Sequence, residues 1–278
     1  MARSDVSPVG TTGAGATIGR METITHPFAS QSLPSPADRL GELQSVIFDL
    51  DGTLIDTVEL IRVSFRYATE AVLGEALPDE ITMANVGQPL LTQFVDMAPE
   101  HADELLRVYR AFNREHHDEL AHAYPGTIEV LQELARRRIP MAIVTSKGTE
   151  SATRGIDLFG LADLIPVVVT ADDVVLHKPD PYPLRVAAER LGVELEYSLY
   201  LGDSPHDMQA AISGDAIAVA ALWGAFSAQD VLEPGPSFAL ESISELPALL
   251  DGDAGRFAVR GSNDRPRIAG PSSDRRTL

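Results

Sequence analysis

The chain has 278 residues, and its 41 acidic against 22 basic side chains give a formal net charge of −19 at pH 7. Such acidity argues against a nucleic-acid or anionic-membrane partner, because those surfaces require patches of Lys and Arg. The chain has no cysteine, which excludes disulfides, thiolate catalysis and cysteine-bound zinc. No apolar run approaches the ~18 residues of a membrane span and no secretory leader is recognisable, so we expect a cytoplasmic protein.

Both ends of the chain lack the apolar periodicity of a folded segment. Residues 1–42 and 252–278 are rich in small and polar residues, and we predict that both are flexible tails. Between them, short apolar runs typical of strands alternate with helical periods. The runs lie at 45–49, 140–145, 166–170, 197–203 and 216–220, and the helical periods at 129–138, 181–191 and 241–250. This alternation predicts an α/β fold, a Rossmann-like parallel sheet with helices on both faces.

One stretch between the first two predicted strands departs from the alternation. Residues 57–124 are helical in pattern throughout, although a simple crossover between parallel strands needs only one helix. An apolar stripe on one helical face is formed by Leu105, Tyr109, Phe112 and His116. We therefore predict a small helical cap, inserted in a core domain made of residues 43–56 and 125–251.

Four segments at or just beyond the ends of predicted strands carry reactive side chains, and ligands of parallel sheets bind at such ends. They are DLDGT at 49–53, Thr145 with Ser146, Lys178, and GDSPHD at 202–207. A carboxylate can attack phosphorus, a second carboxyl group can move the proton, and carboxylates can hold Mg²⁺. Hydroxyl, backbone N–H and lysine groups can bind phosphate oxygens. The set therefore predicts phosphoryl transfer.

The order of these motifs resembles the haloacid-dehalogenase-like hydrolase superfamily over residues 45–250. Within it, the chain looks most like phosphoglycolate phosphatases and bacterial pyrophosphatases with a small helical cap. The resemblance implies that Asp49 is the nucleophile and that Asp51 is the general acid and base. It also implies a Mg²⁺ site and a phosphate site. The metal-binding residues would be Asp49, Asp51 through its carbonyl, Asp203 and, through water or as a supporting group, Asp207; the phosphate-binding residues would be Gly52, Thr53, Thr145, Ser146 and Lys178.

These roles predict a Mg²⁺-dependent phosphatase that hydrolyses a small phosphorylated metabolite, similar to phosphoglycolate, through an aspartyl-phosphate intermediate. An inorganic pyrophosphatase of the same superfamily is the alternative. A sugar-phosphate mutase fits less well, and so does a non-enzymatic phosphate-sensing domain, which would need neither the cap nor Asp51. The expected partner is a small phosphorylated substrate.

Lysine is scarce, since Lys147 and Lys178 are the only two in the chain. Scarcity and motif order favour phosphate contact for Lys178, whereas we expect Lys147 to be exposed or to lie near the edge of the cap. We expect His116 to be packed in the cap, with substrate contact as the alternative, and His206 to face solvent in its turn. Residues 85–89 form either a plain connector or a turn that reaches toward the substrate.

Overall fold

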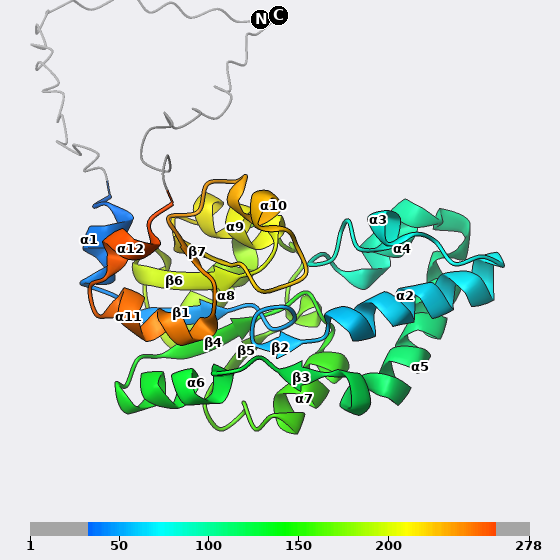
Figure 1. The fold of residues 1–278 in the computed structure, drawn as a ribbon, viewed down its shortest axis with the longest axis horizontal. Helices are drawn as coiled ribbons and strands as arrows, with labels where there is room; N and C mark the ends of the chain where they lie inside the picture. Colours follow the sequence, from blue (N-terminus) through cyan, green and yellow to red (C-terminus); the bar gives the residue numbers. More distant parts are fainter. Residues whose placement is uncertain (1–32, 260–278) are drawn as a thin grey trace, which may run out of the picture. The chain divides into compact units, whose positions relative to one another are not determined.

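The structure of the chain, a computed structural model, describes residues 33–259. Within these residues, six parallel strands form one sheet in the order β5-β4-β1-β6-β7-β8 (Figure 1). The strands are β1 (Ser45–Phe48), β4 (Met141–Val144), β5 (Val167–Val169), β6 (Ser198–Gly202), β7 (Ile217–Ala221) and β8 (Phe238–Leu240). A short antiparallel pair joins β2 (Ile55–Asp56) to β3 (His122–Ala123).

The helices of the described residues alternate with the strands, except between β2 and β3, where several follow one another. They are α1 (Pro36–Leu40), α2 (Val58–Leu73), α3 (Asp79–Thr82), α4 (Leu90–Met97), α5 (Ala102–Leu120), α6 (Thr127–Arg136), α7 (Thr149–Leu158), α8 (Tyr182–Leu191), α9 (Pro205–Ser213), α10 (Ala228–Leu232), α11 (Leu246–Leu250) and α12 (Ala254–Phe257). Four single turns of 3₁₀ helix lie at 99–101, 171–173, 195–197 and 243–245. Among residues 33–259, none of the helices has the length and apolar character that crossing a membrane requires.

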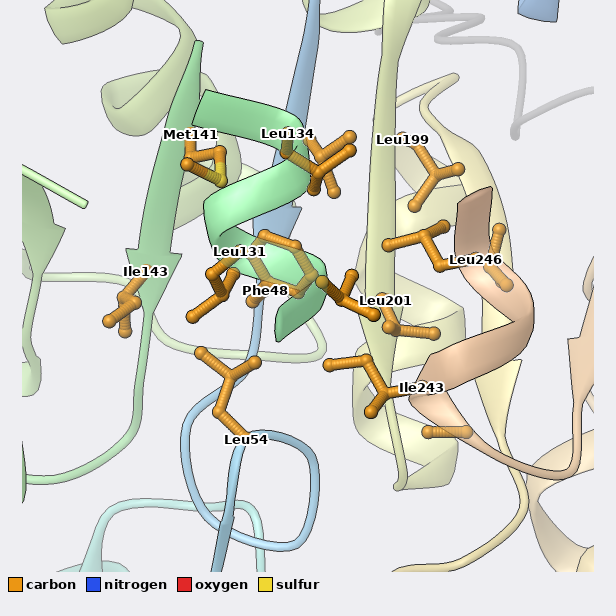
Figure 2. Close-up of a cluster of buried hydrophobic side chains, with 14 of the residues drawn as sticks. Phe48, Leu54, Leu131, Leu134, Met141, Ile143, Leu199, Leu201, Ile243 and Leu246 are labelled. Carbon is orange, nitrogen blue, oxygen red and sulfur yellow. The ribbon is translucent and has the colours of Figure 1, made fainter. Parts of the chain in front are cut away.

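Alternate residues of β1 show how the sheet is covered on both faces. Val46 and Phe48 belong to an apolar cluster with α6, α7 and α11, whereas Ile47 belongs to a second cluster with α8 and α9. Figure 2 shows part of the first cluster, in which side chains of β1, β4 and β6 meet those of α6 and α11. Burial on both faces explains why the strands are continuous apolar runs in the sequence. The predicted α/β fold with a parallel sheet is confirmed.

The segment between β2 and β3 has a small apolar cluster of its own. Helices α2, α4 and α5 pack around it, and the rings of Phe65, Phe94 and Tyr109 meet edge to face with centroids 4.9–5.8 Å apart. The two ends of the segment lie side by side, because Ile55 of β2 pairs with Ala123 of β3. We call this segment, residues 57–121, the helical insertion.

The buried stripe of α5 differs from the predicted one. It continues from Tyr109 through Asn113 to His117, in steps of four residues, so His117 is buried. The expectation that His116 is packed in the stripe is wrong. The predicted stripe passes from Tyr109 to Phe112, three residues on, whereas the buried face passes from Tyr109 to Asn113, four residues on. His116 instead stacks on Phe112 with ring centroids 4.0 Å apart and stays partly exposed.

The folded part extends beyond both predicted tail boundaries. Within 1–42, Pro36–Leu40 form α1, whose Arg39 guanidinium donates to the carbonyl oxygens of Glu196 and Asp215 at 2.5 and 2.6 Å. Within 252–278, α12 buries Phe257 against the main core. These anchors are single residues, which leave no periodic pattern in the sequence. Residues 1–32 and 260–278 of the predicted tails lie outside the described residues.

We expect Phe257→Ala to lower the free energy of unfolding by about 3 kcal/mol, because removing a buried aromatic ring leaves a cavity. Val175→Ala is the matched control, since Val175 is 84% exposed and its loss should change stability by less than about 0.5 kcal/mol. Urea unfolding of both variants measures the difference. Equal stabilities would mean that α12 does not contribute to the core.

Candidate active site

Two neighbouring strands of the sheet bring three acidic side chains together. Asp49 follows β1 and Asp203 follows β6, which pair directly, and Asp207 lies in the first turn of α9. Each offers a carboxylate oxygen within 4.8 Å of the other two, and all three are buried. Three buried like charges repel one another, so this arrangement requires cations.

Lys178 supplies one of these cations. Its Nζ donates to Asp49 Oδ1 at 2.8 Å and to Asp207 Oδ1 at 2.6 Å, and the side chain is only 2% exposed. A third contact, at 3.2 Å, joins Nζ to the hydroxyl of Tyr200, which itself donates to Asp207 at 2.8 Å. All three ammonium protons are therefore used inside the acidic cluster. Tyr200 was not predicted, because in the sequence it is one more apolar residue of a buried strand.

The acids differ in how well their charges are compensated. Burial raises the pKa of Asp49 to about 7, against the opposing charge of Lys178. Burial, together with the charges of Asp49 and Asp207, raises the pKa of Asp203 well above its ordinary value. The pKa of Asp207 is lowered despite burial, because Lys178 is ion-paired and hydrogen-bonded to it. The ionised forms of Asp49 and Asp203 are thus poorly compensated by the protein, and a further cation would stabilise them.

Asp207 is held by its own helix start. Its Oδ2 accepts hydrogen bonds from the Ser204 backbone N at 3.1 Å and from Ser204 Oγ at 2.6 Å, and its backbone N donates back to Ser204 Oγ. This capping box fixes one carboxylate oxygen, while the other binds Lys178 and Tyr200. Asp207 Oδ1 therefore holds the ammonium group of Lys178 from a carboxylate that is itself fixed.

The loop after β1 closes tightly around Asp203. Gly52 has φ +79°, a left-handed conformation, and a β-carbon at this position would overlap the Asp203 carboxylate. Asp203 Oδ2 accepts from the backbone N of Ala225 at 2.7 Å, and Thr53 Oγ1 lies 3.4 Å from Oδ1. The glycine of the DLDGT segment is thus required by the close approach of a carboxylate from another strand.

Asp51 has a cationic partner that the sequence analysis did not identify. Lys147 Nζ donates to Asp51 Oδ1 at 2.6 Å, and Thr57 Oγ1 donates to the same oxygen at 2.6 Å. Of the two expectations for Lys147, exposure is wrong, because its side chain is only 16% exposed. A position near the cap agrees with the structure, because Lys147 lines the cavity together with residues of the helical insertion. The physical reason is strand order, since β4 lies beside β1 and their terminal loops face each other. The scarcity of lysine was the signal that could have identified it.

A cavity of about 560 Å³ opens beside the cluster, between the sheet and the helical insertion. The predicted site residues that line it are Asp49, Asp51, Thr145, Ser146 and Asp203. The others support these from behind and do not line it; they are Gly52, Thr53, Lys178 and Asp207. Thr145 Oγ1 accepts from the backbone N of Lys147 at 3.2 Å, which orders the loop after β4.

The helical insertion is attached to the core on two sides of the cavity. On one side, Gln88 Nε2 lies 2.8 Å from His206 Nε2, and Ser146 Oγ donates to the carbonyl oxygen of Gly87. His206 is therefore half-buried, and the expectation that it faces solvent is wrong. On the other side, Arg114 of α5 pairs with Glu150 of α7 at 3.3 Å. Four of the residues 85–89 line the cavity, so this turn reaches the site and is not a plain connector.

Comparison with known proteins agrees with this geometry. Residues 46–221 match the family described as haloacid dehalogenase-like hydrolase. The chain belongs to this family. The predicted family is therefore confirmed. The prediction that the protein is a hydrolase of the phosphatase type is confirmed as well.

The alignments with individual relatives include almost the whole length of each relative. Pyrophosphatase PpaX of Bacillus velezensis is 36% identical over 202 residues, which are 73% of this chain and 94% of the relative. A hydrolase of Pseudomonas syringae has a crystal structure with a TM-score of 0.69 and 28% identity, covering 75% of this chain and 98% of the other. A predicted phosphoglycolate phosphatase of Haemophilus somnus, at 23% identity and a TM-score of 0.66, covers 75% and 98%.

The overlap at Gly52 can be separated from the cost of its backbone conformation. Gly74 has a similar φ of +83° but no heavy atom within 4 Å of an added β-carbon, so Gly74→Ala should lose only about 1–2 kcal/mol of stability. Gly52→Ala should lose more, and should also lower kcat for an aryl phosphate ~100-fold by displacing Asp203. Similar losses in both variants would contradict the required close approach.

Proposed function

We propose that this haloacid dehalogenase-like hydrolase splits inorganic pyrophosphate in the cavity beside Asp49, with Mg²⁺ as its cofactor. The observation that carries the proposal is the set of cations beyond the acidic cluster. Lys147, Arg110, Arg114 and Arg154 all line the cavity, and a second phosphate group needs such partners. The 36% identity to a relative named pyrophosphatase PpaX supports the same substrate.

Asp49 is assigned the nucleophilic role because its carboxylate faces the cavity while Lys178 fixes its Oδ1 from behind. An Asp49 oxygen attacks phosphorus, and the bond from phosphorus to the leaving oxygen breaks as the aspartyl phosphate forms. Water then attacks the same phosphorus and releases inorganic phosphate, which restores the Asp49 carboxylate. Both steps require a group that moves a proton.

Asp51 is assigned that proton transfer. Its hydrogen bonds from Lys147 and Thr57 both use Oδ1, so Oδ2 is the oxygen that gives a proton to the leaving group and later takes one from water. Lys147 and Thr57 also fix the orientation of the carboxyl group, which lines the cavity. This arrangement lets one side chain serve as acid in the first step and base in the second.

The donor set of the acidic cluster fits Mg²⁺. Asp49 and Asp203 offer buried carboxylate oxygens whose ionised form a cation would stabilise, and Mg²⁺ prefers oxygen ligands and retains several waters. Bound there, the ion would supply charge neutralisation for the phosphoryl oxygens. We include the backbone carbonyl of Asp51 among the proposed Mg²⁺ ligands on the resemblance alone. We propose that Asp207 supports the site by orienting Lys178.

A second candidate is a small organic phosphate ester similar to phosphoglycolate. The cavity wall on the side of the helical insertion contains apolar side chains, among them Ile61, Phe65 and Leu106, which pyrophosphate does not require. An organic leaving group would bury against them. The cations and the 36% identity to a relative named pyrophosphatase PpaX favour pyrophosphate, so we propose the two substrates in the reverse of the order predicted from the sequence.

The choice of substrate is tested by kinetics. We expect the full chain with Mg²⁺ to show a higher kcat/KM for pyrophosphate than for 2-phosphoglycolate, and Asp49→Asn to abolish both activities. Phosphate release measured side by side decides between the candidates. A higher value for 2-phosphoglycolate would select the organic ester, and no Mg²⁺-dependent release from either above the Asp49→Asn background would reject both.

The metal site is tested without turnover. Mg²⁺ at 100 times its Kd should stabilise the protein by about 2.7 kcal/mol, which corresponds to a rise in Tm of roughly 5–11 °C. Asp203→Asn should remove this rise, because it takes away a buried ligand charge. Asp163→Asn is the control, since Asp163 is exposed and lies outside the cluster. An unchanged Mg²⁺ response in Asp203→Asn would place the ion elsewhere.

A further inference from the structure

Two residues that line the cavity have a buried side-chain polar atom without a hydrogen-bond partner among the described residues. These atoms are Gln93 Oε1 and His117 Nε2. An amide oxygen can only accept a hydrogen bond, whereas an imidazole nitrogen can either donate or accept. A phosphate oxygen can contact His117 Nε2 in two ways: it accepts from the protonated ring, or, when the phosphate carries the proton, it donates to the neutral ring. Gln93 Oε1 can serve only the second of these, so we consider His117. Because buried polar groups normally have partners, an unpartnered nitrogen at a cavity wall indicates a ligand contact.

The ring of His117 is held in place from its other nitrogen. Nδ1 lies 3.0 Å from Asp118 Oδ1, and the same carboxylate accepts from Arg154 Nε at 2.9 Å and Nη2 at 3.0 Å. Arg154 lies on α7 of the core, while His117 and Asp118 lie on α5. The hydrogen bonds from Arg154 and His117 lower the pKa of Asp118 to about 2, so it stays an acceptor. The contact fixes the tautomer with the proton on Nδ1 and leaves Nε2 available.

The ring of His117 packs beside α7 of the core. A β-carbon on Gly155 of α7 would lie 3.6 Å from His117 Nε2, so the helix approaches the ring closely. Burial lowers the pKa of His117, while Lys147 and Asp51 act on it with opposite signs. These two groups are the ones assigned to the leaving-group side of the reaction. His117, Lys147 and Asp51 also line the same cavity, so the ring belongs to the wall that the departing group would meet.

We propose that His117 Nε2 binds an oxygen of the leaving group, which in pyrophosphate is the second phosphate, and that Asp118 is its positioning residue. This inference rests on the proposed function, because it requires a substrate with an oxyanion beyond the transferred phosphoryl group. One proton between Nε2 and that oxygen makes the contact, whether the ring or the phosphate carries it. An aryl leaving group has no such oxygen and gains nothing from His117.

The test compares two substrates in two variants of the full chain with Mg²⁺. His117→Asn keeps a hydrogen-bond donor near the position of Nδ1 but has no atom at the position of Nε2. We expect kcat/KM for pyrophosphate to fall about 10- to 100-fold, the effect of losing one hydrogen bond to a charged group. For an aryl phosphate the same variant should change kcat/KM by less than threefold. His116→Asn, the neighbouring histidine outside the cavity, should leave both values unchanged.

The outcomes separate the contact from a structural role. A loss of equal size for both substrates would mean that His117 only packs α5 against α7, and the proposal would be overturned. The same holds if Tm falls so far that the variant is partly unfolded under the assay conditions. No loss for pyrophosphate would overturn it as well. If the wild type prefers 2-phosphoglycolate, the proposed function fails, but the ratio of 2-phosphoglycolate to aryl phosphate activity tests His117 in the same way. Recovery of pyrophosphate activity in His117→Gln, whose longer amide reaches toward the position of Nε2, would support the contact.

Discussion

The ammonium group of Lys178 is the interaction on which the site depends. It lies between the carboxylates of Asp49 and Asp207 in a region closed to solvent, where each charge alone would be strongly unfavourable. A buried ion pair of this kind demands accurate placement of three segments: the end of β1, the start of α9 and the loop before α8. The parallel sheet provides that placement, because β1 and β6 are hydrogen-bonded neighbours whose ends cannot shift without breaking the core.

The sheet and the acidic cluster were predictable because both have a local signature. A strand that is buried on both faces is a continuous apolar run, and its end is marked by the first charged residue. Asp49 and Asp203 therefore stand out in the sequence, and strand pairing brings them together. The fold class follows from the alternation of such runs with helices. The strand β8 has a weaker signature than β5 of the same length, because β5 consists of three valines whereas Phe238–Leu240 contains no β-branched residue.

Lys147 and His117 could not be found in this way, because their positions depend on contacts between distant segments. The partner of Lys147 is 96 residues away along the chain, and only the order of the strands makes the two meet. His117 and His116 differ by one position on a helix, and choosing between them needs the direction of the helix face to within about 100°. The anchors of α1 and α12 are likewise single long-range contacts in segments of loop-like composition.

The pairing of β2 with β3 has a consequence for how such enzymes diversify. Because the helical insertion leaves and re-enters the core at two adjacent points, its length and sequence can change without moving any strand of the sheet. The carboxylates stay with the core, while half of the residues that line the cavity belong to the insertion. The acidic cluster and much of the cavity wall are thus encoded in separate stretches of the sequence. A lineage can exchange one while inheriting the other intact.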